Sequence, residues 1–242
     1  MRISLISDDD VFRLSTVYPR QENDAWITDK GITGLFGAVP PREKGTDRPQ
    51  MDGAYWPSRL TAGGRTITVH AAAICRSSAS AVLLRDRLRA LTAKPLTIQL
   101  EDTAGIRRMS GWLADDPEPT MLLRDRVFEF SLILYCPDPL QYGLPVDYTA
   151  AGGVIRVLNE GMLSVWPVIL ASNASRLTVS LAGRKVTWSG SASQPLTLDM
   201  ADMIPSQGTV SYDFAFQLPP GESTVGVVSD GSVRMRVCPA WR

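Results

Sequence analysis

The second half of this chain alternates apolar and polar residues with a period of two, and this pattern constrains the fold more than any other feature. From Ala150 onward the alternation recurs in short runs, and no apolar spacing of three and four residues predicts a convincing helix. The runs are residues 154–158, 165–170, 176–181, 185–188, 196–200, 209–216, 224–228 and 233–237. Short strands at this spacing, with Gly183 marking a hairpin between the third and fourth, predict an antiparallel β-sandwich or jelly-roll.

The first half of the chain predicts strands and one α-helix. Alternating runs predict strands at residues 65–74, 95–101, 106–114 and 128–134. Between the first two of these runs, apolar residues recur at spacings of three and four, as they do on one face of a helix. These residues are Ala81, Leu84, Leu88 and Leu91. Ser77 or Ser78 can cap this helix, which we expect near residues 78–93, before a proline ends it.

The strand at residues 128–134 ends abruptly, and its end predicts a domain boundary. Two prolines follow in the sequence Cys-Pro-Asp-Pro, and proline has no backbone N–H, so the hydrogen-bond ladder cannot continue. A glycine, a proline and a Gly-Gly pair come next, within residues 143–153, where we expect protease-sensitive backbone. The sequence therefore predicts a β-rich domain with one helix at residues 1–143 and an all-β domain at residues 150–242.

A long segment rich in proline and glycine, residues 40–64, interrupts the first domain. It has four prolines, four glycines and few periodic apolar residues, which predicts a long loop or arm. Tyr55 and Trp56 are apolar residues in this segment, and charged residues including Arg48 and Arg59 surround them. Aromatic side chains inside a charged rim are typical of interface centres, so these four residues form our candidate oligomer interface. A disordered surface loop is the alternative.

Composition argues against several classes of partner. Lys plus Arg and Asp plus Glu each number 25, so the net charge is zero and no overall basic field attracts nucleic acid or an anionic membrane. No run of about 18 apolar residues predicts a membrane span, and the first residues are too polar for a signal peptide. We therefore expect a cytoplasmic globular chain with no membrane partner. The three cysteines, Cys75, Cys136 and Cys238, are far apart, which predicts buried reduced thiols.

Catalytic residues are hard to find in this sequence. His70 is the only histidine, and it lies inside a predicted strand without a second histidine or a CxxC pair beside it. No GxSxG turn is present for a nucleophile, and Asp8 to Asp10 lack the ligand spacing of a calcium loop, so we expect a solvated turn there. We therefore predict that the protein is not an enzyme and has no catalytic residue, metal site or cofactor.

Two other functions stay open. A glycoside hydrolase needs a pair of carboxylates close in space, for which the candidates are Glu101, Asp102, Asp115, Asp116 and Glu118. A carbohydrate-binding protein that attaches to a cell wall is the second alternative, because aromatic side chains such as Trp166, Trp188 and Trp241 can stack on sugar rings. We expect Trp166 and Trp188 to be core residues instead.

The order of the motifs along the chain is more specific than any single motif. In the first half the motifs are "MDGAYW", "AGGRTITVHAAA", "SSASAVLLRDRLRAL", "PLTIQL", "RRMSGWLAD" and "VFEFSLILYCPDPLQYG". In the second half they are "VLNEGMLSVWPVI", "LTLDM", "LPPGESTVGV" and the terminal "CPAW". Over nearly its whole length, the chain resembles the distal tail protein (Dit) family of phages with long non-contractile tails.

Two sets of residues carry this resemblance at the level of single positions. Asp138, Pro139 and Tyr142 are similar to the turn and tyrosine that follow the last strand of the family's belt domain. The family also has an Asn-x-Gly sequence followed by a strand that a proline marks. The matching residues here are Asn159, Gly161 and Pro167.

The resemblance implies a structural hub at a phage tail tip. Family members form hexameric rings in which belt domains close a channel for DNA, while galectin-like C-terminal domains project outward. They join the tail tube protein to the tail-associated lysin or the tail-tip and baseplate hub proteins, and the tape measure protein is a further candidate partner. On this resemblance, residues 1–143 form the belt domain and residues 150–242 the galectin-like β-sandwich. The protein would be a virion component, assembled in the host cytoplasm, that DNA meets only in transit.

Overall fold

The structure is a computed structural model that describes residues 1–17, 24–43, 45–122 and 125–242. Strands dominate it, and the described residues contain a single α-helix, so the predicted mainly-β fold class is confirmed. The chain divides into two compact units. The first comprises Met1–Gln141 together with Arg242, and the second comprises Tyr142–Trp241.

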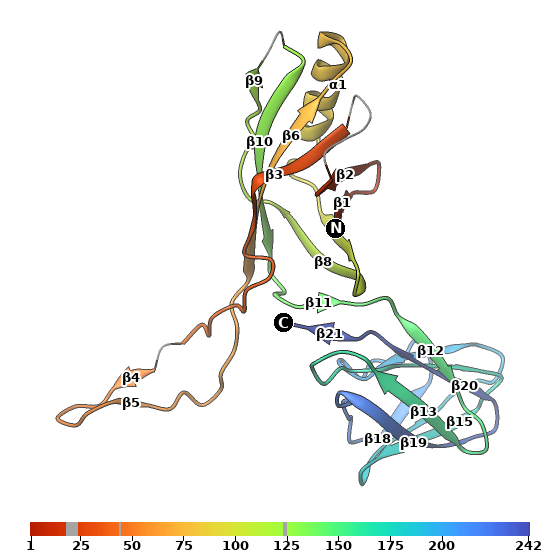
Figure 1. Ribbon diagram of the computed structural model, residues 1–242. Coiled ribbons are helices and arrows are strands. Elements are labelled where there is room, and N and C mark those ends of the chain that lie inside the picture. Colours follow the sequence, from red (N-terminus) through yellow and green to blue (C-terminus); the bar gives the residue numbers. More distant parts are fainter. Residues whose placement is uncertain (18–23, 44, 123–124) are drawn as a thin grey trace. The chain divides into compact units, whose positions relative to one another are not determined.

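Seven strands of the first unit form a closed barrel (Figure 1). They are β1 (Arg2–Ile6), β2 (Val11–Ser15), β3 (Asp24–Thr33), β6 (Arg65–Ile74), β7 (Leu96–Asp102), β8 (Gly105–Leu113) and β10 (Val127–Cys136). The order of neighbours is β8-β7-β1-β2-β3-β6-β10, and β10 closes the barrel by pairing with β8. The β2–β3 pair is parallel, whereas the pairs on either side of it are antiparallel. A short strand, β9 (Thr120–Leu122), extends the sheet beyond β10.

The alternating patterns of the sequence account for the barrel core. The four strands predicted in this half are present as β6, β7, β8 and β10, with small shifts at their ends. In β10 the inward side chains are buried, and Phe130 packs edge-on against Phe12 of β2 with ring centroids 6.1 Å apart. The apolar face of each strand therefore points into the barrel, as the period of two requires.

Helix α1 (Ser78–Arg89) begins at the predicted serine cap. The Ser77 hydroxyl accepts a hydrogen bond from the Ser80 backbone N–H at 3.1 Å, which satisfies one of the free donors of the first turn. The helix ends at Arg89 rather than near residue 93, although Leu91 beyond it is still fully buried. The apolar pattern continues past the helix because the following turn also packs on the barrel core.

The acidic segment Asp8 to Asp10 forms the turn between β1 and β2 and is held to the helical region by ion pairs. The Asp10 carboxylate accepts two hydrogen bonds from the Arg87 guanidinium, one of them 2.6 Å long from Nη2. Asp9 pairs with Lys94 at 2.6 Å. The hydrogen bond from Arg87 lowers the pKa of Asp10 below its ordinary range. The predicted turn is present, but two of its three carboxylates have basic partners.

The second unit is a sandwich of two antiparallel sheets. The four-stranded sheet has the order β12-β20-β14-β17, and the five-stranded sheet has the order β13-β19-β15-β16-β18. The strands are β12 (Val146–Thr149), β13 (Val154–Asn159), β14 (Val168–Ser172), β15 (Arg176–Leu181), β16 (Arg184–Ser189), β17 (Leu196–Asp199), β18 (Thr209–Asp213), β19 (Gly221–Ser229) and β20 (Ser232–Val237). All eight strands predicted in this half are present, and the predicted hairpin at Gly183 joins β15 to β16.

The second unit begins earlier than the predicted boundary at Ala150. Strand β12 lies within the segment that we expected to be an exposed linker, and it pairs with β20 along its whole length. Asp147 of β12 fixes this edge, because its carboxylate accepts hydrogen bonds from Arg236 at 2.7 and 2.9 Å. Two short strands, β11 (Gln141–Tyr142) and β21 (Ala240–Trp241), complete the described elements outside the arm. Strand β12 has only four residues and follows a proline, so its alternation of apolar and polar residues is too short to predict a strand.

The cysteines mostly follow the prediction. Cys75 and Cys136 are buried thiols, whereas Cys238 is partly exposed and its Sγ lies 3.2 Å from the Gly143 carbonyl oxygen. Burial raises the pKa of Cys136 to about 11, so its thiol is protonated at neutral pH. Among the described residues, no helix is both long and apolar enough to cross a membrane.

Candidate functional site

The predicted interface residues lie on an arm, residues 36–64, that leaves the barrel between β3 and β6 (Figure 1). Its two segments run together near the barrel, where the Arg42 N–H donates to the Thr61 carbonyl at 2.8 Å. At its tip a small hairpin forms from β4 (Thr46–Asp47) and β5 (Ala54–Tyr55). The arm therefore has backbone pairing of its own, and the description of a loop without structure does not fit it.

The base of the arm is anchored by a buried arginine. Arg65, the first residue of β6, is 1% exposed and its Nη1 donates to the Gly34 and Leu35 carbonyls at 3.0 and 2.6 Å. Its Nε donates to the Pro139 carbonyl at 3.0 Å. Burial lowers the pKa of Arg65. One side chain thus holds the departing end of the arm, its returning end and the turn after β10.

Gly34 makes the departure of the arm sterically feasible. Its φ is +78°, a conformation that costs a residue with a side chain more than it costs glycine. A Cβ at this position would lie 2.0 Å from the backbone oxygen of Thr66. The chain can turn this closely against β6 only because residue 34 has no side chain.

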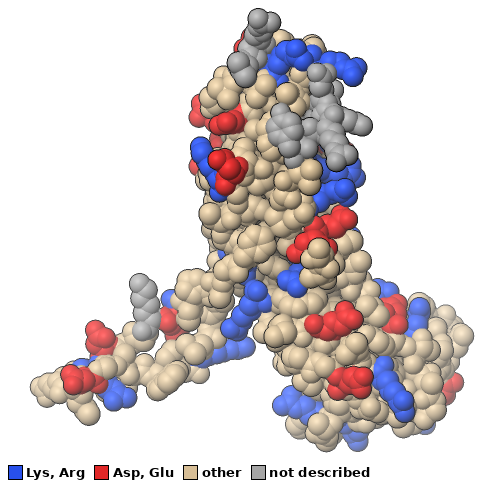
Figure 2. Space-filling model, in the orientation of Figure 1, with Lys and Arg blue, Asp and Glu red and all other residues tan. Residues whose placement is uncertain are grey.

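Large apolar side chains lie exposed along the arm. The exposed set is Phe36, Met51, Tyr55, Trp56 and Leu60. Trp56 is 83% exposed, a large apolar area for a single side chain to leave in water. Figure 2 shows acidic and basic side chains mixed along the same segment. This combination of exposed aromatic and mixed charged residues is the one expected of an interface before its partner is bound.

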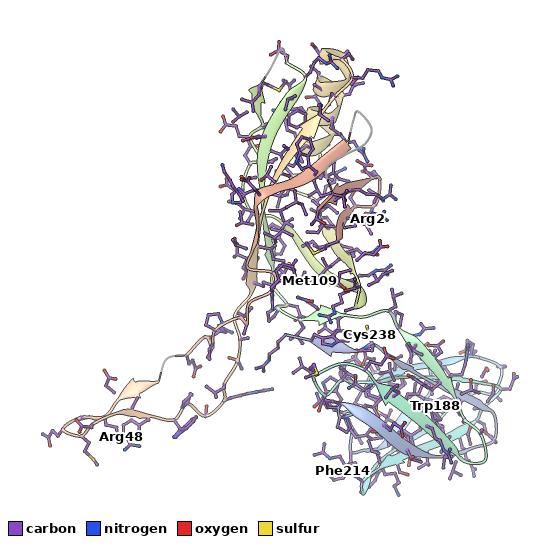
Figure 3. The ribbon with its side chains drawn as sticks, in the orientation of Figure 1. Arg2, Arg48, Met109, Trp188, Phe214 and Cys238 are labelled. Carbon is purple, nitrogen blue, oxygen red and sulfur yellow. The ribbon has the colours of Figure 1, made fainter. Side chains whose placement is uncertain are left out.

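The structure brings together two of the four predicted interface residues. The guanidinium of Arg48 lies over the ring of Tyr55, 5.5 Å from its centroid, and Arg48 also closes the hairpin through its N–H to the Gly53 carbonyl at 3.0 Å (Figure 3). Trp56 follows directly after β5, and Arg59 is exposed farther along the returning segment. That these residues contact another subunit stays a prediction.

The three motif residues that follow β10, Asp138, Pro139 and Tyr142, have structural roles. The Asp138 carboxylate accepts the Leu140 N–H at 3.0 Å, which forms a local turn, and the Pro139 carbonyl accepts the bond from Arg65. Tyr142 packs against the core of the second unit. This motif therefore ends β10 and ties the base of the arm to the same point.

Asn159, Gly161 and Pro167 fix the loop between β13 and β14. The amide nitrogen of Asn159, which is 2% exposed, donates to the Leu163 and Leu218 carbonyls at 2.9 and 3.1 Å. Gly161 lies so close to Ala240 that a Cβ would come within 2.5 Å of its backbone nitrogen. Pro167 is buried. The Asn-x-Gly sequence therefore makes room for the last short strand of the chain.

The polar groups considered for chemistry lie apart from the arm. His70 Nδ1 is 2.9 Å from the Ser131 hydroxyl, across the β6–β10 pair. Asp115, Asp116 and Glu118 line a hollow beside these strands, whereas Glu101 of β7 pairs with an arginine of β1. Within the described residues, no group of three or more His, Cys, Asp or Glu side chains is placed to hold a metal ion.

The tryptophans of the sandwich differ from the expectation that both lie in its core. Trp188 is 1% exposed and its Nε1–H donates to the Gln207 carbonyl at 2.7 Å. Trp166 is 40% exposed, because its neighbours Val165 and Pro167 take the inward positions of the alternating pattern.

A side chain that the sequence analysis did not single out is Phe214, which Figure 3 shows at the periphery of the sandwich.

Comparison with known proteins gives matches to solved structures. No protein-family model and no curated protein matches the sequence. The fold is similar to that of SPP1 Dit (gp 19.1), a paradigm of the hub adsorption apparatus in phages that infect Gram-positive bacteria, with a TM-score of 0.69, 15% identity and 99% of each chain covered. It is also similar to a chain of the phage p2 baseplate in its activated conformation with Sr, with a TM-score of 0.50, 9% identity and 98% of each chain covered. The resemblance to Dit proteins indicated by the sequence motifs is thus confirmed at the level of the fold.

Proposed function

We propose that this chain is a structural hub protein of a phage tail tip, where it forms a hexameric ring around a channel for DNA. The observation that carries the proposal is the likeness to SPP1 Dit over 99% of both chains. Both compact units take part in that likeness, so it extends beyond a sandwich shared with unrelated binding proteins. In this proposal the barrel unit is the belt domain and the sandwich unit is the galectin-like domain.

A closed ring needs two different complementary patches on each subunit, since each copy contacts one neighbour with one patch and the next neighbour with the other. The arm is suited to be one of these patches. Its exposed aromatic residues, including Tyr55 and Trp56, contribute little to the barrel core, and burial against a neighbour would remove them from water. A standard contact of this kind covers about 800 Å² on each partner.

The proposed neighbours in the virion follow from the position of a hub. The ring would join the tail tube protein on one side to the tail-associated lysin or tail-tip hub protein on the other, with the tape measure protein as a further candidate. The chain would be assembled in the host cytoplasm and would remain at the tail tip. We assign it no catalytic activity and no cofactor.

The oligomeric state tests this proposal. The full chain is expected to elute as a hexamer in size-exclusion chromatography with light scattering, and its particles should be ring-shaped in electron micrographs. Deleting residues 41–58 should weaken the ring without unfolding the barrel, because every barrel strand and Arg65 remain in place. A strictly monomeric full chain at high concentration would contradict the ring.

A matched pair of point variants tests whether ring formation depends on the arm or on exposed apolar side chains in general. Trp56→Ala removes the most exposed aromatic residue of the arm, and Met162→Ala removes a side chain that is 73% exposed in the sandwich unit. We expect Trp56→Ala to raise the concentration needed for ring formation at least about tenfold, as for the loss of an interface hot spot. Met162→Ala should leave it unchanged. Equal behaviour of the two variants would remove the arm from the assembly mechanism.

A further inference from the structure

We infer that the outer face of the five-stranded sheet binds an acidic oligosaccharide. The site is a hollow of about 510 Å³ between the β15–β16 turn, β18 and β19, and we call it the sheet hollow. The residues that carry the argument are Ser180, Arg184, Lys185, Tyr212, Thr224 and Gly226. This inference concerns a binding function in addition to the proposed hub.

The hollow exists because a glycine stands at its floor. Gly226 of β19 pairs with Ser180 of β15, and both face away from the sandwich core, since their neighbours Val225, Val227 and Val179 are buried. A Cβ at Gly226 would lie 2.8 Å from the Ser180 hydroxyl oxygen. The sheet surface is therefore lowest at this point, and the serine hydroxyl borders the free space.

Hydroxyl groups in the hollow are available to a ligand. Neither Ser180 Oγ nor Thr224 Oγ1 has a hydrogen-bond partner among the described residues. Elsewhere on the same face, in contrast, the hydroxyls of Thr178 and Thr187 bond to each other at 3.2 Å. A hydroxyl both donates and accepts a hydrogen bond, so two of them beside a hollow suit a ligand that itself carries many hydroxyls.

Exposed aromatic rings stand at one side of the hollow. Tyr212 is 44% exposed, and it packs against Phe214, which is 58% exposed, with ring centroids 5.1 Å apart. Figure 3 shows Phe214 at the periphery of the sandwich. A pair of exposed aromatic rings beside hydroxyl groups can take the apolar face of a sugar ring while the hydroxyls bind its edge. A small inorganic anion can accept hydrogen bonds from the hydroxyls, but it cannot stack on the rings.

The charge of the hollow selects an acidic ligand. Lys185 Nζ lies 4.7 Å from the centroid of the Tyr212 ring, and Arg184 donates from Nη1 to the Ala215 carbonyl at 3.1 Å. None of the described residues that line the hollow is acidic. Within the described part of the chain neither Arg184 nor Lys185 forms an ion pair, so both can attract a negatively charged group, and a uronic acid or a similarly charged sugar fits better than a neutral one.

Calorimetric titration of the full chain tests the inference with three hexasaccharides and sulfate. The acidic probes are galacturonic acid hexamer and hyaluronan hexasaccharide, and the neutral probe is maltohexaose. We expect at least one acidic probe to bind at least about tenfold more tightly than the neutral probe. The same probe should bind more tightly than sulfate when the two are compared at the same concentration of negative charge. No binding of either acidic probe, equal binding of the neutral probe, or equal binding of sulfate would each overturn the inference.

Variants of the hollow provide a second test. Tyr212→Ala and Lys185→Ala should each weaken binding of the acidic probe at least about tenfold. Gly226→Val should do the same by filling the floor without removing a polar group. The matched controls are Phe36→Ala, an exposed aromatic residue of the arm, and Lys30→Ala, an exposed lysine of the barrel unit. Unchanged binding in the hollow variants would overturn the inference, as would equal losses in the controls, provided that circular dichroism shows each variant folded.

Discussion

Replacing Arg65 with methionine is expected to loosen the base of the arm while the barrel stays folded. Methionine keeps much of the side-chain volume and removes the guanidinium, so the change tests the hydrogen bonds rather than the packing. The Gly34 and Pro139 carbonyls would lose the donor they have in the structure, whereas the Leu35 carbonyl would keep its bond from Gln141 Nε2 at 3.2 Å.

The magnitude follows from these contacts. A buried carbonyl left without a donor costs about 1–3 kcal/mol. The bonds to Gly34 and Pro139 are only partly buried, so each loss lies near the lower end of this range, and the two together cost about 2 kcal/mol. Part of this loss is offset, because Arg65 is a buried cation and its Nη2 has no hydrogen-bond partner among the residues that the structure describes. We therefore expect a net loss of about 1.5 kcal/mol, confined to the region that Arg65 holds together.

Amide hydrogen exchange on the full chain measures this loss where it occurs. A local destabilisation of about 1.5 kcal/mol corresponds to roughly tenfold faster exchange. The Arg42 N–H, which bonds across the arm to Thr61, should show this acceleration, whereas amides within β7 should not. Arg108→Met is the matched control, since Arg108 is exposed and donates to Gln99 at 2.9 Å on the barrel surface. Unchanged exchange in Arg65→Met would refute the reasoning.

Three further predictions concern the stability of the two units. Trp188→Ala should lower the unfolding free energy of the sandwich by about 3–5 kcal/mol, measured by thermal and urea unfolding, because it leaves a large cavity in the core. Asp10→Asn should lower the unfolding free energy by about 1 kcal/mol or less at neutral pH. Because Arg87 lowers the folded-state pKa of Asp10, the difference in unfolding free energy between this variant and the unmodified chain, measured by urea unfolding, should shrink as the pH falls below about 4 and disappear below that folded-state pKa. A fragment of residues 142–242 should fold with a higher melting temperature than one of residues 150–242, which lacks β12 and its pairing with β20.

The strands that the sequence predicts are those with one buried face and one face that is more exposed. In β10 and β20 every second residue is buried, so the period of two is visible without any knowledge of neighbours. Residues 1–33, where three barrel strands lie, carry this signal only in short stretches, such as the buried Phe12 and Leu14 on either side of the exposed Arg13 in β2. In β1 the consecutive residues Ile3, Ser4 and Leu5 are all buried, because contacts cover both faces of this strand. The barrel closure between β10 and β8 depends on residues about twenty positions apart and has no local pattern.

The candidate site was predictable in composition but not in geometry. The aromatic and charged residues of the arm are plain in the sequence, whereas the anchor at Arg65 joins carbonyls that lie 30, 31 and 74 positions away. No spacing rule indicates such contacts. The exposure of Trp166, by contrast, could have been derived, since the alternation that buries Val165 and Pro167 directs the residue between them outward.

The ring and the sheet hollow can be tested together, because a ring would change how the hollow binds a polymer. A hexamer would present several hollows at once, so a long acidic polysaccharide would gain about a hundredfold or more from multivalent binding, while a hexasaccharide that fills one hollow would gain nothing. Deleting residues 41–58 should therefore weaken binding to immobilised polygalacturonate and leave the affinity for the hexasaccharide unchanged. Tyr212→Ala should weaken both. A deletion that also lowered the hexasaccharide affinity would mean that the arm takes part in the hollow, and the two functions could no longer be assigned to separate units of the chain.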